Sequence, residues 1–320
     1  MFTLKPIVSV IMSAYNAEKF IANSIESILN QTLQEFELII IDDASTDSTL
    51  KIIESYTDSR IIVLKNDFNK GQSTNLNKAI DMTRGKYVAK ADADDICMPN
   101  RLEVQVKYLE EHPDISLISS YMNSFGDEIV QFRPLLHDDD IRIRLLFKSV
   151  LPHPGFMMRL SDINKANIRY NNQFKYAQDY DFQARASDQL KLAVIPRVLI
   201  KYRIHGEQIS VAKQDEQKYY ANQVRVYQLK RLGIHLKEQY ISKYEIILYK
   251  KNALSIKEWN LILFVFDQIL KRNSLIKMYN EKRLKNEIKN FLTNYIENES
   301  NILKKKFYFP KIDILLNKYQ

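Results

Sequence analysis

Hydrophobic positions along the first hundred residues follow two different periods. Four near-continuous apolar runs are typical of strands buried on both faces, and they cover residues 7–12, 36–41, 60–64 and 86–91. Between the first two runs and between the last two, apolar residues recur at helical spacing: Ile21, Ile25, Ile28 and Leu29, then Leu76, Ala79, Ile80 and Met82. This alternation predicts an α/β fold with a mostly parallel, Rossmann-like sheet flanked by helices. Ligands bind such sheets beyond the carboxyl ends of the strands.

The pattern changes after residue 100. Pro99 suits the first turn of a helix over 100–112, and an apolar run at 115–120 predicts another strand, with antiparallel strands following around Phe125 to Phe132. Residues 150–212 mix short strands, loops and a helix near Asp181 to Gln189. Residues 213–320 contain one glycine and one proline and predict helices throughout. We therefore expect an α/β domain over 1–212 and a helical extension over 213–320.

The net charge of +8 is unevenly distributed along the chain. Residues 213–320 carry 22 Lys and Arg against 11 Asp and Glu, together with ten of the 19 tyrosines, whereas residues 1–212 carry 25 against 28. A basic surface of this kind attracts nucleic acid or an anionic membrane, and it is equally compatible with a set of solvated helix faces. The basic character of the chain therefore belongs to the extension.

The compartment is indicated by the cysteine content and by the N-terminus. Cys97 is the single cysteine, which excludes an internal disulfide and fits a reducing compartment. The first fifteen residues have an apolar stretch interrupted by Ser9 and Ser13, without a small-residue cleavage site, so they predict a strand rather than a signal peptide. The longest later apolar run, 261–266, is far below the roughly 20 residues that span a bilayer. We expect a cytoplasmic protein without a transmembrane helix.

Acidic residues gather where two of the predicted strands end. Asp42 and Asp43 follow the second strand, and Asp92, Asp94 and Asp95 follow the fourth. In extended backbone the side chains at i and i+2 share a face, so Asp92 and Asp94 point the same way and Asp95 points oppositely. Paired carboxylates repel each other and commonly bind a hard divalent cation, Mn²⁺ or Mg²⁺. The alternative is a solvated acidic turn that caps the next helix.

Seven motifs in order are similar to those of the family 2 glycosyltransferases, which are inverting nucleotide-sugar enzymes with the GT-A fold. They are VSVIMSAYNAEKFI, IIIDDASTDST, NKGQSTNLNKAI, RGKYVAKADADDICMPNRLE, HPGFMMR, QDYDFQAR and YRIHGEQIS. The resemblance covers about residues 5–212 and does not extend to 213–320. It implies a GT-A catalytic domain over 1–212, with nucleotide-sugar binding in about 1–100 and the acceptor side in about 101–212, followed by the basic, Tyr-rich extension.

The resemblance also implies roles for residues of the donor side. Ala14 and Tyr15, in SAYN, are similar to positions that contact the nucleotide, and Asp43 is similar to the aspartate that accepts a hydrogen bond from the uracil edge. Asn77 matches a donor-proximal asparagine. Asp92 resembles the first aspartate of an Asp-X-Asp signature, near the ribose and the metal.

Further roles follow at the metal and on the acceptor side. Asp94 resembles the metal ligand of the Asp-X-Asp signature, and His205 resembles a late histidine that reaches the metal or the diphosphate, where Arg203 adds positive charge. Asp179 aligns with the general base that takes the proton of the acceptor hydroxyl. His153 lies in a segment that resembles the border of the acceptor site, and a Pro-rich connection with a surface histidine is the alternative.

These implied roles describe an inverting transfer of a hexose from a UDP-sugar to a saccharide or lipid-linked saccharide, as in bacterial surface polysaccharide synthesis. A metal ion assists the departure of the diphosphate, and one base is sufficient because the product is inverted. Two other classes remain as alternatives. A nucleotidyltransferase is expected to carry a Gly-rich loop after the first strand, where this chain has SAYNAEKF. A non-catalytic nucleotide-sugar-binding module has no need for Asp179.

The extension has three interpretations. Its lysines and the apolar residues Trp259, Leu263 and Phe266 fit docking at the inner face of the cytoplasmic membrane, as a peripheral protein, and NILKKKFYF is the most suggestive stretch. The same apolar residues also fit packing onto the catalytic domain or a homodimer contact. We expect no nucleic acid as partner, because such a protein has no need for Asp92, Asp94 and Asp179 together.

Overall fold

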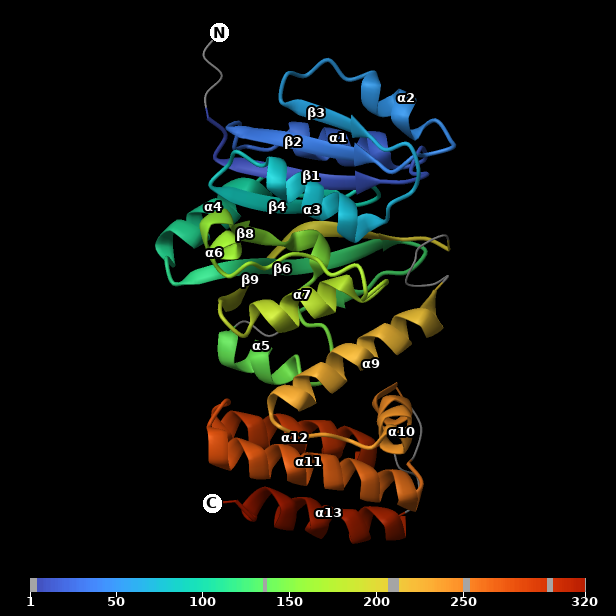
Figure 1. Cartoon of the computed structure of the whole chain (residues 1–320), viewed down its shortest axis with the longest axis vertical. Helices are drawn as coiled ribbons and strands as arrows, with labels where there is room; N and C mark the ends of the chain where they lie inside the picture. The colour runs from blue at the N-terminus through green and yellow to red at the C-terminus, as the bar shows by residue number, and fades with distance from the viewer. Residues whose placement is uncertain (1–4, 135–136, 207–212, 250–253, 298–301, 320) are drawn as a thin grey trace. The chain divides into compact units, whose positions relative to one another are not determined.

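The structure is a computed structural model that describes residues 5–134, 137–206, 213–249, 254–297 and 302–319 (Figure 1). Its contacts divide the chain into two compact units. The first comprises Met1–Ile141 with Val150–Gln214, and the second comprises Arg142–Ser149 with Asp215–Gln320.

A mixed sheet forms the centre of the first unit. Four parallel strands, in the order β3, β2, β1, β4, account for the four apolar runs: β1 (Val8–Ala14), β2 (Phe36–Asp42), β3 (Ile61–Lys65) and β4 (Tyr87–Asp92). The sheet continues from β4 through β8 (Met157–Arg159), β6 (Ile115–Gly126), β9 (Lys191–Ile204) and β5 (Ile96–Cys97), and β7 (Gln131–Phe132) pairs with β6. β8 is antiparallel to β4 and β6, whereas β6 and β9 are parallel. The predicted α/β fold is confirmed.

Helices cover both faces of the parallel strands because β1 is apolar on both sides. Val8, Val10 and Met12 join one core cluster with the buried face of α1 (Ile21–Leu29). The alternate side of β1 faces α3 (Gln72–Met82), where Asn75 donates a hydrogen bond to Ser13 Oγ over 3.0 Å. The other helices are α2 (Thr49–Glu54), α4 (Arg101–Glu111), α6 (Leu160–Lys165) and α7 (Gln178–Ala186), with a 3₁₀ turn η1 at His153–Gly155 and α5 (Asp138–Arg144) at the boundary between the units.

The second unit is helical, as predicted for residues 213–320. Its helices are α9 (Gln214–Arg231), α10 (Glu238–Tyr249), α11 (Ile256–Ile276), α12 (Glu281–Glu297) and α13 (Ile302–Asn317). Trp259 of α11 stacks on Tyr308 of α13 with 4.6 Å between the ring centroids, and Phe266 packs edge-on against Phe147. An ion pair between Arg144 and Glu287 ties the segment 142–149 to α12, with Nη2 donating to Oε2 over 2.7 Å. Among the described helices, none is both long and apolar enough to cross a membrane.

Candidate active site

Asp43 directly follows β2, and its carboxylate is surrounded by donors. It is almost fully buried and accepts hydrogen bonds from Asn66 Nδ2 (2.8 Å) and from the backbone N–H groups of Lys70 (2.8 Å) and Gly71 (2.9 Å). Burial by itself raises the pKa of this carboxyl, but the hydrogen bonds from Lys70, Asn66, Asn75 and Gly71 outweigh it and leave the pKa below its ordinary value. Asp43 is therefore ionised and fixed in position at the carboxyl edge of the sheet.

Two asparagines that were not singled out from the sequence support the surroundings of Asp43, which we call the nucleotide corner. Asn66 follows β3 directly, and its Nδ2 also donates to Asn75 Oδ1 over 2.7 Å. Asn75, buried in the first turns of α3, links that pair to Ser13 at the end of β1. Its position could have indicated Asn66, because it lies at the carboxyl end of a parallel strand, as Asp43 does, and ligands bind at that edge of the sheet.

Ala14 and Tyr15 lie at the end of β1, next to this corner. The Ala14 carbonyl accepts the backbone N–H of Asp43 over 2.8 Å, and the Ala14 side chain is buried. Tyr15, which directly follows β1, has a half-exposed side chain. Asn16 has a positive φ of 48° and its Oδ1 accepts the backbone N–H of Thr46, so the loops after β1 and β2 are fixed to each other.

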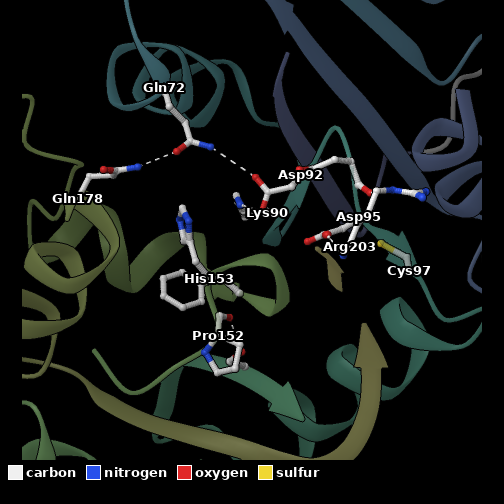
Figure 2. Close-up of polar contacts among 12 residues, drawn as sticks. Gln72, Lys90, Asp92, Asp95, Cys97, Pro152, His153, Gln178 and Arg203 are labelled. Atoms are coloured by element: carbon white, nitrogen blue, oxygen red, sulfur yellow. Dashed lines mark hydrogen bonds and ion pairs between the residues drawn. The ribbon is translucent and has the colours of Figure 1, made fainter. Parts of the chain in front are cut away.

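The acidic residues after β4 lie in different environments. Asp92 forms an ion pair with Lys90, which is on the same strand face and has a side chain only 1% exposed. Gln72 Nε2 donates to the other oxygen of Asp92 over 3.4 Å (Figure 2). Lys90 was not singled out from the sequence, because it is one polar residue in an otherwise apolar run. Its positive charge compensates the negative charge of the Asp92 carboxylate.

Asp94 lies against His205, with 3.2 Å between Asp94 Oδ2 and His205 Nε2 and side chains that are 28% and 20% exposed. Burial, followed by the negative charge of Asp92, raises the pKa of the Asp94 carboxyl. Arg203 supports the turn, because its Nε donates to the Asp94 carbonyl over 2.9 Å and its guanidinium lies between the rings of Phe20 and Phe125. Residues from β4 and from the end of β9 therefore converge here.

Asp95 is buried and accepts the backbone N–H of Arg203 over 2.9 Å. Its second oxygen, Oδ2, is buried without a hydrogen-bond partner among the described residues. Burial, together with the charges of Asp92 and Asp94, raises the pKa of the Asp95 carboxyl well above its ordinary value. Three carboxyl groups therefore lie close together in one corner, with Lys90 paired to Asp92 and the Arg203 guanidinium against the Asp94 carbonyl.

The donor set of this corner fits a hard divalent ion that shares its ligands with a substrate. Within the described ranges no group of three or more His, Cys, Asp or Glu side chains is placed to hold a metal by itself. Asp94 and His205 supply one carboxylate oxygen and one imidazole nitrogen, which lie 3.2 Å apart. Mg²⁺ and Mn²⁺ are commonly bound through one or two protein ligands together with substrate phosphates, so a two-residue set is adequate when a diphosphate completes it.

Asp179 lies in the first turn of α7, where the helix dipole favours a negative charge. Tyr170 is buried nearby, and its hydroxyl lies 2.8 Å from His153 Nε2. Burial, followed by the charges of Asp179 and Asp92, raises the pKa of Tyr170 well above its ordinary value, and burial with the charge of Lys90 lowers the pKa of His153 well below its own. The histidine and the phenol therefore form a neutral pair beside the carboxylates.

Asn77 has a defined structural contact. Its amide donates to the Tyr170 carbonyl and accepts the Tyr170 N–H, both over 2.8 Å, so it fixes α3 to the segment that precedes α7. Asp181 forms an ion pair with Arg185 on α7, with Nη2 and Oδ2 2.5 Å apart. Of the residues singled out from the sequence, the structure gathers Asp92, Asp94, Arg203 and His205 in one corner, with Asp43 on the neighbouring loops. His153 contacts Tyr170, whose pKa is raised in part by the charge of Asp179.

A mixed sheet with polar groups at the carboxyl ends of its parallel strands defines an α/β enzyme of the GT-A class, and sequence comparison gives the family. Residues 9–169 match the family described as Glycosyl transferase family 2, and the chain belongs to it. An uncharacterized glycosyltransferase of Haemophilus influenzae is 36% identical over 250 residues, which are 72% of this chain and 77% of that protein. The Escherichia coli protein WfaP, a UDP-Glc:α-D-GlcNAc-diphosphoundecaprenol β-1,3-glucosyltransferase, is 38% identical over 115 residues, 36% of this chain and 46% of its own length.

Solved structures support the fold at low sequence identity. TarS of S. aureus, residues 1–349 in complex with UDP-GlcNAc, superposes with a TM-score of 0.62 and 19% identity over 91% of this chain and 88% of that chain. The mannosyltransferase PcManGT of Pyrobaculum calidifontis, in complex with GDP-Man and Mn²⁺, gives a TM-score of 0.57 and 16% identity over 92% of this chain and 86% of that one.

Proposed function

We propose that this glycosyltransferase moves a hexose from a UDP-sugar to a saccharide or lipid-linked saccharide in bacterial surface polysaccharide synthesis, with inversion at the anomeric carbon. The observation that carries the proposal is the arrangement of Asp43 and the Asp94–His205 pair at one edge of the mixed sheet, where β2, β4 and β9 end. An ionised acceptor for a nucleobase and a pair of metal-ligand atoms are the two recognition elements that a nucleoside diphosphate requires. The name of WfaP and the complex of TarS with UDP-GlcNAc support UDP as the nucleotide.

The donor side binds and orients the nucleotide sugar. Asp43 accepts a hydrogen bond from the uracil edge, the half-exposed ring of Tyr15 covers the base, and Ala14 contributes backbone at the end of β1. Asp92 faces the ribose while Lys90 compensates its charge. Asn77 keeps α3 in place beside the donor. Arg203 adds positive charge behind Asp94.

The chemistry divides between two groups of residues. Asp94 and His205 would hold a Mn²⁺ or Mg²⁺ ion, which when bound neutralises the negative charge that the departing diphosphate gains. Asp179 takes the proton of the acceptor hydroxyl as that oxygen attacks from the face opposite the diphosphate, which gives an inverted product. His153 borders the acceptor, and because its ring is neutral it can hydrogen-bond a sugar hydroxyl without attracting an anion.

The second unit is proposed to contact the anionic inner face of the cytoplasmic membrane, where a lipid-linked acceptor lies. α13 exposes Phe307, Phe309 and Ile314 beside lysines, and Lys311 Nζ lies 4.0 Å from the centre of the Phe307 ring. Apolar side chains flanked by lysines are typical of helices that lie in the membrane interface.

A panel of nucleotide sugars tests the proposal. Wild-type protein is incubated with UDP-, GDP- and dTDP-hexoses, Mn²⁺ and lipid-linked or oligosaccharide acceptors, and transfer is followed by release of the nucleotide and by the mass of the product. We expect transfer from a UDP-sugar with inversion of the anomeric centre. Asp179→Ala is expected to bind UDP and Mn²⁺ as the wild type does and to lose turnover by at least about 100-fold, the lower end of the usual contribution of a general base. Transfer with retention, or an active Asp179→Ala variant, would contradict the proposal.

A further inference from the structure

Three side-chain contacts join α3 to the segment that leads into α7. Along α3 the partners follow one another in the reverse of their order along the segment: Gln72 with Gln178, Asn77 with Tyr170, and Asp81 with Arg169. The last contact is an ion pair of 2.9 Å in which Asp81 is mostly exposed, so it contributes little by itself. The first contact lies at the N-terminus of both helices, which is the end that faces the candidate site.

The contact between the two glutamines extends to the Asp-X-Asp corner. Gln178 Nε2 donates to Gln72 Oε1 over 2.7 Å, and Gln72 Nε2 donates to Asp92 Oδ1 over 3.4 Å, as the dashed lines in Figure 2 show. Gln72 therefore accepts with its oxygen and donates with its nitrogen. A single amide side chain links the carboxylate at the end of β4 to the residue that precedes Asp179.

The N-terminus of α3 is itself fixed to the nucleotide corner. Gly71, which precedes α3 with a positive φ of 83°, donates its N–H to Asp43, and Asn75 is hydrogen-bonded to Asn66. The N-terminus of α7 has less support from regular structure, because Tyr176 just before it has a positive φ of 65° and the preceding residues form turns. A hydrogen bond from Gln178 to α3 is therefore placed where it can fix the direction of the first turn of α7.

We propose that Gln72 and Gln178 are positioning residues, which set Asp179 relative to the bound donor through their amide–amide hydrogen bond. This inference rests on the proposed function, in which Asp179 is the general base. A base that is displaced by about 1 Å from the productive position can lose about 100-fold in rate while binding is unaffected. The Gln178 amide touches no reacting atom in this assignment and contacts Asp92 only through Gln72, so its removal acts on turnover and leaves the affinity for the donor unchanged.

Methionine substitutions test the pair, because methionine keeps the length of glutamine and removes both hydrogen-bonding groups. Gln178→Met and Gln72→Met are compared with the double variant by steady-state transfer at saturating acceptor. We expect kcat to fall by about 10- to 100-fold in each single variant, with the donor KM of Gln178→Met within about twofold of wild type. The double variant should be no slower than the slower single variant, because both substitutions remove one shared interaction.

Gln189→Met is the matched control, since the Gln189 amide is exposed and donates to the Ala166 carbonyl over 3.4 Å, away from α3. Thermal unfolding and UDP binding of all variants establish that the fold and the donor site are intact. An unchanged kcat in Gln178→Met, multiplicative losses in the double variant, or a loss confined to the donor KM would each overturn the positioning role. A wild-type protein that transfers no sugar refutes the proposed function instead, and the inference then falls with it.

Discussion

His205 Nε2 lies 3.2 Å from Asp94 Oδ2, although 111 residues separate the two along the chain. The contact forms because β9 runs through the sheet to the same edge at which β4 ends. Arg203 holds the two ends together, with its backbone N–H on Asp95 and its Nε on the Asp94 carbonyl. A carboxylate and an imidazole in contact at a strand edge provide the start of a metal site that a diphosphate can complete.

Replacing Asp94 should remove the dependence of nucleotide binding on metal, and replacing His205 should weaken it. In wild-type protein we expect UDP to raise the Tm more with Mn²⁺ than without it, because ligand binding to the folded state adds to stability. In Asp94→Ala the increment due to Mn²⁺ should disappear, and in His205→Ala the apparent affinity for Mn²⁺ should fall about 10-fold or more. Thermal shift with and without UDP measures both.

His112→Ala is the control, since His112 is exposed and packs on Tyr108 away from the corner. It should keep the full Mn²⁺ increment. An equal increment in Asp94→Ala and in wild type would contradict the assignment of the metal ligands.

Lys90 should be more important for stability than an ordinary surface lysine. Its side chain is 1% exposed and is paired with Asp92, whose side chain is 19% exposed. Removing one partner of a buried ion pair leaves an uncompensated charge and costs roughly 3–5 kcal/mol. Lys90→Met should therefore lower the free energy of unfolding in urea by a few kcal/mol, and adding Asp92→Asn should restore part of it.

Lys86→Met provides a matched comparison just before the same strand. Lys86 is paired with Glu110, but both side chains are about half-exposed, at 52% and 48%. Such a pair contributes about 0–1 kcal/mol. Equal effects of Lys86→Met and Lys90→Met would show that the Lys90–Asp92 pair has no special role.

The helices and strands that produce a regular hydrophobic pattern could be predicted from the sequence. The parallel strands and their helices were predicted because burial on both faces leaves apolar runs, and Asp43 and Asp92 were found because strand ends meet at one edge. Lys90, Asn66 and Asn75 were missed because each is a single polar residue whose use depends on a partner distant in sequence. The same is true of Gln72, which has a role only when α3 meets α7.

The boundary between the two units shows a similar limit. Residues 142–149 pack with the second unit, where Phe147 contacts Phe266 and Phe291. No local pattern separates these residues from their neighbours. Their apolar side chains look like ordinary core positions in the sequence, and only the folded structure shows that they pack against the helices of the second unit.

The ionised state of Asp43 should make its contribution to stability depend on pH. Its pKa in the folded protein lies below the ordinary value of 3.8, so between these values the unfolded chain binds more protons than the folded one. The stabilisation is complete above pH 3.8 and is lost as the pH falls through the pKa of the folded state. Asp43→Asn also places an amide nitrogen against donors, at a cost of about 1–3 kcal/mol.

Urea unfolding at pH 6 and at pH 3.5 measures this dependence. The difference in free energy of unfolding between wild type and Asp43→Asn should be large at pH 6 and smaller at pH 3.5. Asp127→Asn, at an exposed aspartate beyond β6, should leave the free energy nearly unchanged at both values. A difference that stays constant or grows on acidification would contradict the origin assigned to the shift, and Asp43→Asn is also expected to lose UDP binding.

The proposed membrane contact predicts that α13 binds anionic vesicles through its aromatic side chains. Phe307 and Phe309 are 55% and 44% exposed beside Lys306 and Lys311. Because each phenylalanine gains roughly 1–2 kcal/mol when half its surface leaves water, Phe307→Ser with Phe309→Ser should weaken binding to phosphatidylglycerol vesicles by about 10-fold or more. Flotation at two salt concentrations measures the effect, since the lysines add an attraction that salt weakens.

Tyr219→Ser is the control for this experiment, because Tyr219 is equally exposed, at 56%, but lies on α9, outside the lysine-rich stretch of α13. It should float as the wild type does, and vesicles of phosphatidylcholine alone should retain little of any variant. If the double variant floats as well as the wild type, the exposed aromatic residues of α13 serve another purpose, and contact with a second protein surface then becomes the better explanation of their exposure.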